Sequence, residues 1–142
     1  MARIRGRGTK LEVFSGKAGP LNQLIFEILR TKKLAIYDTY LEVRRVRGYR
    51  HKKYQIVDRR MKKLLEQGWL ILEGTKKTQP GTDAPFYRLS NKGYNALDLD
   101  KVSMDRFLSE ANEQLQLEMT KLLDRFQESV KKQNSTRQKI EP

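Results

Sequence analysis

Residues 54–72 read YQIVDRRMKKLLEQGWLIL, and this stretch decides the fold. Val57, Met61 and Leu64 are spaced four and three residues apart, which places them on one face of a helix. The opposite face is polar and mostly basic, with Gln55, Arg59, Lys62 and Glu66. Gly68 is suited to a left-handed helix cap, and the apolar run after it is typical of a strand. The stretch therefore predicts a helix from about Lys53, with an apolar back and a basic front, followed by a strand over 69–72.

Two amphipathic helices are predicted upstream of this stretch. Gly19-Pro20 is typical of a helix start, because proline at the first helical position sacrifices no hydrogen bond. Apolar residues then recur at helical spacing and predict a helix over 20–31: Leu21, Leu24, Ile25, Ile28 and Leu29. A second stripe predicts a helix over 35–46 that stops near Gly48: Ile36, Tyr37, Tyr40 and Leu41.

Downstream, the chain is predicted to form a hairpin and a short helix. Residues 86–89 are typical of a second strand. Residues 74–85, GTKKTQPGTDAP, predict a long polar loop between the two strands, too long for a tight turn. Ser90 is a good cap for a short helix over 90–97. We expect four aromatic residues with apolar neighbours to lie in the core: Tyr37, Tyr40, Trp69 and Tyr87.

The C-terminal part predicts one long helix over 100–133, because it contains neither proline nor glycine. Its apolar positions follow one another three or four residues apart: Met104, Leu108, Ala111, Leu115, Met119, Leu122, Phe126 and Val130. Such a stripe must be buried, and we expect a second copy of the chain to bury it, giving a homodimer. The alternative is that the helix folds back onto its own domain. Residues 134–142 are expected to be a disordered tail.

Charge is distributed unevenly along the chain. The sequence has 30 Lys and Arg against 17 Asp and Glu in 142 residues, a formal net charge of +13. Residues 1–53 have a net charge of +10, residues 54–99 have +3, and residues 100–142 are neutral. A one-sided excess of this kind indicates a part that faces a polyanion and a part with another role. Residues 44–53, RRVRGYRHKK, are too densely charged to be buried and are predicted to lie on the surface.

Composition excludes several functions. The chain has no cysteine, so disulfides, thiolate catalysis and Cys-ligated metals are excluded. It has a single histidine, no glycine-rich phosphate loop and no metal-ligand spacing. We therefore expect no enzyme activity, no metal and no cofactor. No apolar run is long enough for a membrane span, and the first residues do not match a secretory signal. We expect a cytoplasmic, nucleoid-associated protein that does not bind a membrane.

Residues 61–97 resemble the second half of a winged helix-turn-helix regulator of the PadR or MarR type. The resemblance rests on two phrases, MKKLLEQGWLI at 61–71 and FYRLSNKGYNAL at 86–97. In such families the first phrase leads into the wing and the second leaves it. The first half of the chain departs from PadR at 34–38, LAIYD, where a glycine-tyrosine phrase is usual. The expected fold is mainly α with a small β-hairpin (α+β), a winged helix-turn-helix plus a long C-terminal dimerisation helix.

The resemblance also implies which residues contact double-stranded DNA. The expected recognition-helix residues are Lys52, Lys53, Tyr54, Gln55, Arg59, Lys62 and Lys63, because glutamine can pair with adenine and arginine with guanine in the major groove. The expected phosphate contacts of this region and the wing are Arg44, Arg45, Arg47, Tyr49, Arg50, His51, Lys76 and Lys77. The N-terminal arm adds Arg3, Arg5 and Arg7, which could equally belong to a terminus that is basic by chance. For any one of these charges, a solvated surface position is an equally good interpretation.

Four segments follow from this interpretation. They are a basic flexible arm (1–15), a DNA-binding domain (16–99), a dimerisation helix (100–133) and the tail (134–142). The function expected is sequence-specific transcriptional regulation by a homodimer, with the recognition helix in the major groove and the wing on the adjacent backbone or minor groove. The alternatives are an architectural, partition or replication-terminator-like DNA-binding protein with low sequence preference, an RNA-binding winged-helix protein, or a protein-interaction module. The sequence does not identify a small-molecule effector.

Overall fold

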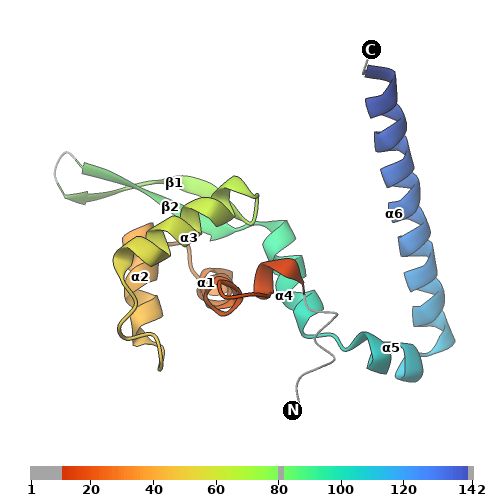
Figure 1. The fold of residues 1–142 in the computed structure, drawn as a ribbon, viewed down its shortest axis with the longest axis horizontal. Coiled ribbons are helices and arrows are strands. Elements are labelled where there is room, and N and C mark those ends of the chain that lie inside the picture. Colours follow the sequence, from red (N-terminus) through yellow and green to blue (C-terminus); the bar gives the residue numbers. More distant parts are fainter. Residues whose placement is uncertain (1–10, 80–81, 141–142) are drawn as a thin grey trace. The chain divides into compact units, whose positions relative to one another are not determined.

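The computed structural model describes residues 11–79 and 82–140 (Figure 1). The elements in chain order are η2 (Glu12–Phe14), α1 (Gly19–Thr31), α2 (Ile36–Arg45), α3 (Tyr54–Glu66), β1 (Leu70–Gln79), β2 (Thr82–Leu89), α4 (Asn91–Asp100), α5 (Met104–Glu110) and α6 (Glu113–Ile140). The chain divides into two compact units, Met1–Lys101 and Val102–Pro142. The order of elements from α1 to α4, and the bounds of α1, α2 and α3 to within one residue, confirm the prediction. The predicted flexible arm (1–15) is wrong for residues 12–14, which form η2 with Phe14 buried.

The core of the first unit is formed where α3 packs against the helices before it. Val57, Met61 and Leu64 are each at most 1% exposed, which confirms the predicted apolar back of α3. They join Ile25 and Phe26 of α1 in one buried cluster that also includes residues of both strands and of α4. The ring of Phe14, from η2, meets that of Phe26 edge-on at 5.1 Å between centroids, so the segment before α1 also packs on the core.

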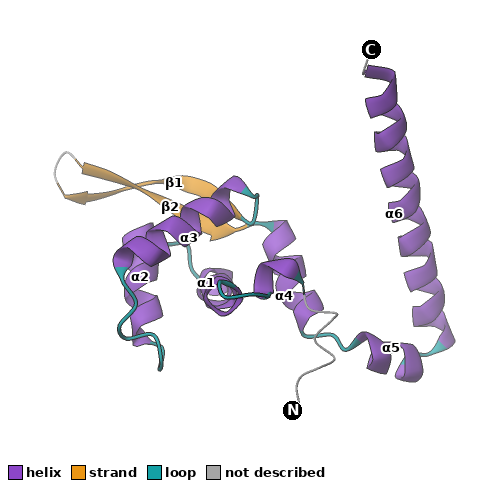
Figure 2. Cartoon of the chain, viewed as in Figure 1, coloured by secondary structure: helices purple, strands orange, loops and turns teal. Residues whose placement is uncertain are grey.

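The hairpin is much longer than predicted (Figure 2). The strands pair antiparallel from Leu70 opposite Leu89 to Gln79 opposite Thr82. The predicted long loop over 74–85 is therefore wrong, because most of these residues are paired in the ladder and only positions 80–81 separate the two strands. Register shifts between Leu72 and Gly74 and between Lys77 and Gln79 mark two irregularities. Such bulges increase the twist of a hairpin.

A backbone bridge ties the hairpin to the turn between α1 and α2. The N–H of Leu34 donates to the carbonyl of Tyr87 (3.0 Å), and the N–H of Tyr87 donates to the carbonyl of Leu34 (2.9 Å). Leu34 thus acts as a one-residue third strand beside β2. This contact joins residues far apart in the sequence, and no local pattern predicts it.

Two predicted caps are confirmed. Gly68 has a φ of +85°, the left-handed conformation expected after α3. The N–H of Trp69 then donates to the carbonyl of Leu64 (2.9 Å), which satisfies an end carbonyl of the helix. At α4, the Ser90 hydroxyl oxygen accepts a hydrogen bond from the N–H of Gly93 (3.1 Å). The same hydroxyl donates to the carbonyl of Gly68 (2.8 Å), so one side chain links the end of α3 to the start of α4.

The second unit consists of two helices, where the sequence predicted one helix over 100–133. The helix α4 ends at Asp100, α5 ends at Glu110, and Ala111 has an extended backbone (φ −67°, ψ 141°). The reason is capping: the Ser103 hydroxyl accepts from the N–H of Arg106 (3.3 Å). The Asn112 side chain likewise accepts from the N–H of Leu115 (2.9 Å) at the start of α6.

The tail prediction is also corrected. The helix α6 continues to Ile140, so residues 134–140 are helical and not a disordered tail. Residues 141–142 lie outside the described part of the chain, as do residues 1–10 of the predicted arm.

Candidate nucleic-acid interface

The outward face of α3 presents the residues that the sequence predicted there. Tyr54, Gln55, Arg59, Lys62 and Lys63 are exposed. Lys52 and Lys53, which were also predicted on this helix, precede it; Lys53 is exposed and Lys52 is partly buried. Lys62 pairs with Asp58 one turn earlier, at 3.1 Å between Nζ and the carboxylate oxygen. Gln55 and Arg59 lie on the same side one turn apart, since residues four apart are neighbours on a helix surface. A flat strip of hydrogen-bonding groups of this kind can read base edges in a groove of about 12 Å.

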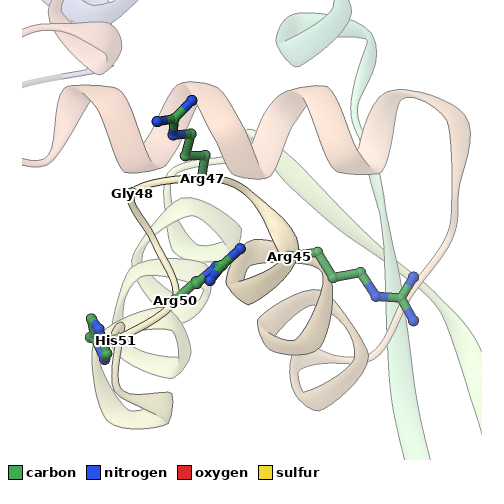
Figure 3. Close-up of a pocket in the computed structure, with 5 residues that line it drawn as sticks. All are labelled: Arg45, Arg47, Gly48, Arg50 and His51. Atoms are coloured by element: carbon green, nitrogen blue, oxygen red, sulfur yellow. The ribbon is translucent and has the colours of Figure 1, made fainter.

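The connection from α2 to α3 forms a basic hollow. Its volume is about 660 Å³, and the residues that line it are Arg45, Arg47, Gly48, Arg50 and His51 (Figure 3). Gly48 has a φ of +92°, so glycine is needed at this turn. The side chains diverge from the turn and do not converge on a single point. Arg45 pairs with Glu42 (3.1 Å), which leaves Arg47, Arg50 and His51 as the exposed groups without such a pair among the described residues.

Arg44 stabilises this connection through two hydrogen bonds. Its Nε donates to the carbonyl of Arg50 (3.0 Å), and its Nη1 donates to the hydroxyl of Tyr40 (3.3 Å). The guanidinium carbon also lies 5.6 Å from the centre of the Tyr40 ring. Tyr49 is half-buried, with the Lys52 ammonium 5.8 Å from its ring centre. Arg44 and Tyr49 therefore have roles within the protein, whether or not they also contact phosphate.

Tyr37, Tyr40 and Tyr54 form a cluster of rings that the sequence analysis did not predict. The Tyr37 ring lies 5.8 Å from that of Tyr40 and 6.1 Å from that of Tyr54. The expectation that Tyr37 lies in the core is wrong, because 57% of it is exposed. Its place in the first turn of α2 directs it toward the start of α3, not inward. The other three aromatic predictions agree with the structure: Tyr87 is buried, and Tyr40 and Trp69 are partly buried against the core.

Lys76 and Lys77 are exposed on the hairpin, opposite Ala84 and Asp83 respectively. Consecutive residues of a strand point to opposite faces. The two lysines thus place one cation on each face of the wing. The sequence analysis had placed both lysines in a long polar loop, and a loop does not define two faces.

An ion-pair group holds the base of the wing. The Glu73 carboxylate lies 2.8 Å from the Lys33 ammonium and 3.6 Å from the Arg88 guanidinium. The hydrogen bond and charge of Lys33, with a further contribution from Arg88, hold the pKa of Glu73 below its ordinary value of 4.5. Because Lys33 adjoins Leu34, the ion pairs and the backbone bridge fasten the same two segments.

The helix α6 carries an exposed apolar stripe. Leu115, Met119, Leu122, Phe126 and Val130 keep the spacing of three or four residues within this helix. Leu123, which the sequence analysis left out, lies four residues after Met119 and widens the stripe; it is 51% exposed. Met104 and Leu108 belong to α5, and Ala111 belongs to the break, so the predicted set of eight does not lie on one helix.

The described residues contain neither a candidate metal site nor a helix that could cross a membrane. Within residues 11–79 and 82–140, no group of three or more His, Asp or Glu side chains is placed to hold a metal ion. None of the helices described has the length and apolar character needed to cross a membrane. The arm residues Arg3, Arg5 and Arg7 lie outside the described part of the chain.

Comparison with known proteins identifies the fold. No protein-family model and no curated protein matches the chain. A PadR-like transcriptional regulator from Bacillus cereus has a similar structure, with a TM-score of 0.52 and 17% identity over 69% of this chain and 93% of that one. A Streptococcus transcriptional regulator has a TM-score of 0.51 and 14% identity over 82% and 99%. Bacillus subtilis PadR in complex with operator DNA has a TM-score of 0.50 and 18% identity over 87% and 78%. The chain thus has the winged-helix fold of PadR-like regulators, which confirms the expected fold class.

Proposed function

We propose that this chain is a transcriptional regulator that binds double-stranded DNA as a homodimer. The observation that carries the proposal is the two-sided character of α3. Its apolar side is fully buried, whereas Gln55, Arg59 and Lys63 are exposed on the other side of a winged helix. A solved structure with a similar fold, Bacillus subtilis PadR, is in complex with operator DNA.

In this proposal α3 enters the major groove and the wing contacts the adjacent backbone or minor groove. Arg59 and Gln55 read base edges, while Arg47, Arg50, His51, Lys52 and Lys53 contact phosphates near the start of α3. Lys76 and Lys77 extend the basic surface onto the wing. The excess of positive charge in the first 99 residues supports a polyanionic partner.

The homodimer is proposed from the exposed stripe of α6. A stripe of five or six large apolar side chains is costly to leave in water. Residues 100–142 have no net charge, so the segment that carries the stripe adds no net repulsion of its own when two copies approach. Two recognition helices would then favour a pseudopalindromic target with half-sites about one turn of DNA apart.

The test is a salt titration of binding to three fluorescent nucleic acids: the DNA upstream of the protein's own gene, a random duplex and a structured RNA. Strong binding that falls steeply with salt and favours the upstream duplex by about a thousandfold supports specific regulation. Equal binding to both duplexes supports the architectural alternative, and preference for RNA contradicts the proposal. Arg59→Gln should weaken duplex binding, whereas Lys121→Gln, the same charge change on α6, should not.

A further inference from the structure

One aliphatic side chain of α3 lies outside the core. The inward positions of this helix, Val57, Met61 and Leu64, are buried, and Leu65 is packed against the same cluster. Ile56 is not part of the cluster, and 39% of it is exposed. Packing within the fold therefore does not account for an aliphatic side chain at this position.

Helix propensity does not account for Ile56 either. Isoleucine is branched at Cβ and forms helices less well than the lysine, arginine and glutamine that occupy most other exposed positions of α3. A single exposed aliphatic residue is common on protein surfaces. Its place on the helix therefore decides which partner it can meet.

Ile56 lies in the first turn of α3, among the residues proposed to contact bases. The helix begins at Tyr54, and the N-terminal residues of a recognition helix are those that reach base edges. Residues three apart are neighbours on a helix surface, which places Ile56 next to Arg59. Lys63, seven residues further on, lies on the same side and is also exposed. This side of α3 is therefore open to a partner along two turns.

An aliphatic group that enters the major groove meets one apolar target on the base pairs. Each base pair presents hydrogen-bonding groups there, and thymine adds its C5-methyl group. A side chain without donors or acceptors that covers a polar base edge leaves that edge without a hydrogen bond, which is costly. Ile56 therefore favours thymine. Gln55, the residue before it, favours adenine, so both residues select A·T pairs.

We propose that Ile56 contacts the methyl group of a thymine and makes the DNA target specific for A·T pairs near the start of α3. This inference rests on the proposed function, because it requires α3 to lie in the major groove. Uracil in RNA lacks the methyl group, so the contact also favours DNA over RNA. The hydrogen bonds of Arg59 to a base edge are separate from it.

The experiment compares two forms of the duplex upstream of the protein's own gene, one with thymine and one with deoxyuridine at every thymine position. The two forms have the same base pairing and charge and differ only in the methyl groups. Loss of the contact should weaken binding by about fourfold for each half-site that makes it. Ile56→Ala should bind the two forms equally, to within about twofold. Because Ile56 lies outside the core, this variant should keep the fold.

Ile71→Ala is the matched control. Ile71 is the same residue type at nearly the same exposure, 38%, but it lies on the wing, opposite Arg88. The wing is proposed to contact the backbone or the minor groove, which displays no methyl group. This variant should therefore keep the full difference between the two forms of the duplex.

Three results would overturn the inference and leave the proposed function in place. They are equal affinity of the unchanged protein for the two forms, a difference that Ile56→Ala retains, and a difference that Ile71→Ala also abolishes. Equal binding of the upstream duplex and a random duplex would instead contradict the proposed function, and this inference with it.

Discussion

The ring of Tyr40 meets the ring of Tyr54 edge-on, with centroids 5.5 Å apart and planes at 90°. This contact joins α2 to the first turn of α3. Edge-to-face geometry is one of the favoured arrangements for two aromatic rings, so this contact helps to hold the two helices together close to the proposed DNA surface. The Tyr37 and Tyr54 hydroxyls next to it have no hydrogen-bond partner among the described residues.

The double replacement Tyr37→Phe and Tyr54→Phe keeps the rings and removes the two free hydroxyls. If these hydroxyls donate to phosphates, duplex affinity should fall by about tenfold or more per hydroxyl, as expected for hydrogen bonds to a charged acceptor. The salt dependence should stay the same, because a neutral group releases no counterion. Arg50→Gln, which removes a cation proposed to contact phosphate, should instead reduce the slope of log affinity against log salt concentration by about one. Unchanged affinity of the phenylalanine variant would refute the contact.

A glutamate on the α6 stripe should prevent dimerisation. Phe126→Glu places a charge where the proposed interface needs an apolar group, so light scattering should give the mass of one chain where the unchanged protein gives two. Leu117→Glu is the matched control. Leu117 is 49% exposed, but it lies two residues from Leu115 and therefore on the opposite face of the helix. Monomers for both variants, or dimers for both, would contradict an interface on this stripe.

The Lys33–Glu73–Arg88 group predicts a specific pH dependence. Folding lowers the pKa of Glu73, so the stabilisation it gives is complete above 4.5 and is lost as the pH falls through the lower folded value. In a carboxyl NMR titration, Glu73 should titrate below 4.5, and Lys33→Gln should move its midpoint upward. Lys32→Gln is the control, because Lys32 pairs with Glu42 and not with Glu73. A Glu73 midpoint that Lys33→Gln does not move would exclude Lys33 as the cause.

The left-handed cap predicts a graded effect on stability. Gly68→Ala should lower the free energy of unfolding by about 1–2 kcal/mol, because a side chain disfavours positive φ. No atom lies within 4 Å of the added Cβ, so the effect comes from backbone conformation alone. Gly68→Asn should cost less, since asparagine tolerates this region better. Thermal or urea unfolding would measure both variants, and equal losses would contradict a purely conformational cause.

Local periodicity was sufficient to predict α3. Val57, Met61 and Leu64 occur at helical spacing, and the buried face that this spacing requires is present in the structure. The glycine cap at Gly68 and the serine cap at Ser90 act within a few residues, so the sequence also revealed them. These features depend only on residues close together in the chain, so the sequence is enough to predict them.

Features that depend on competing or distant interactions were not predicted. The strands of the wing contain lysine, glycine and proline, which are typical of a loop, and only the cross-strand ladder from Leu70 to Gln79 makes them extended. The break before α6 arises because the capping of Asn112 prevails over the helical tendency of its neighbours. At the candidate interface, the exposure of Tyr37 depends on where α3 begins in space, which no stripe on α2 reveals.

The bridge between Leu34 and Tyr87 has a consequence for the order of folding. Both α2 and α3 lie in the length of chain between these two residues, so the bridge closes a loop that contains the whole helix-turn-helix. Closing a loop of this length is entropically costly and is rewarded only when its ends pair. The bridge therefore couples the final orientation of α3 to that of the wing, and we expect the two parts of the proposed DNA surface to form together.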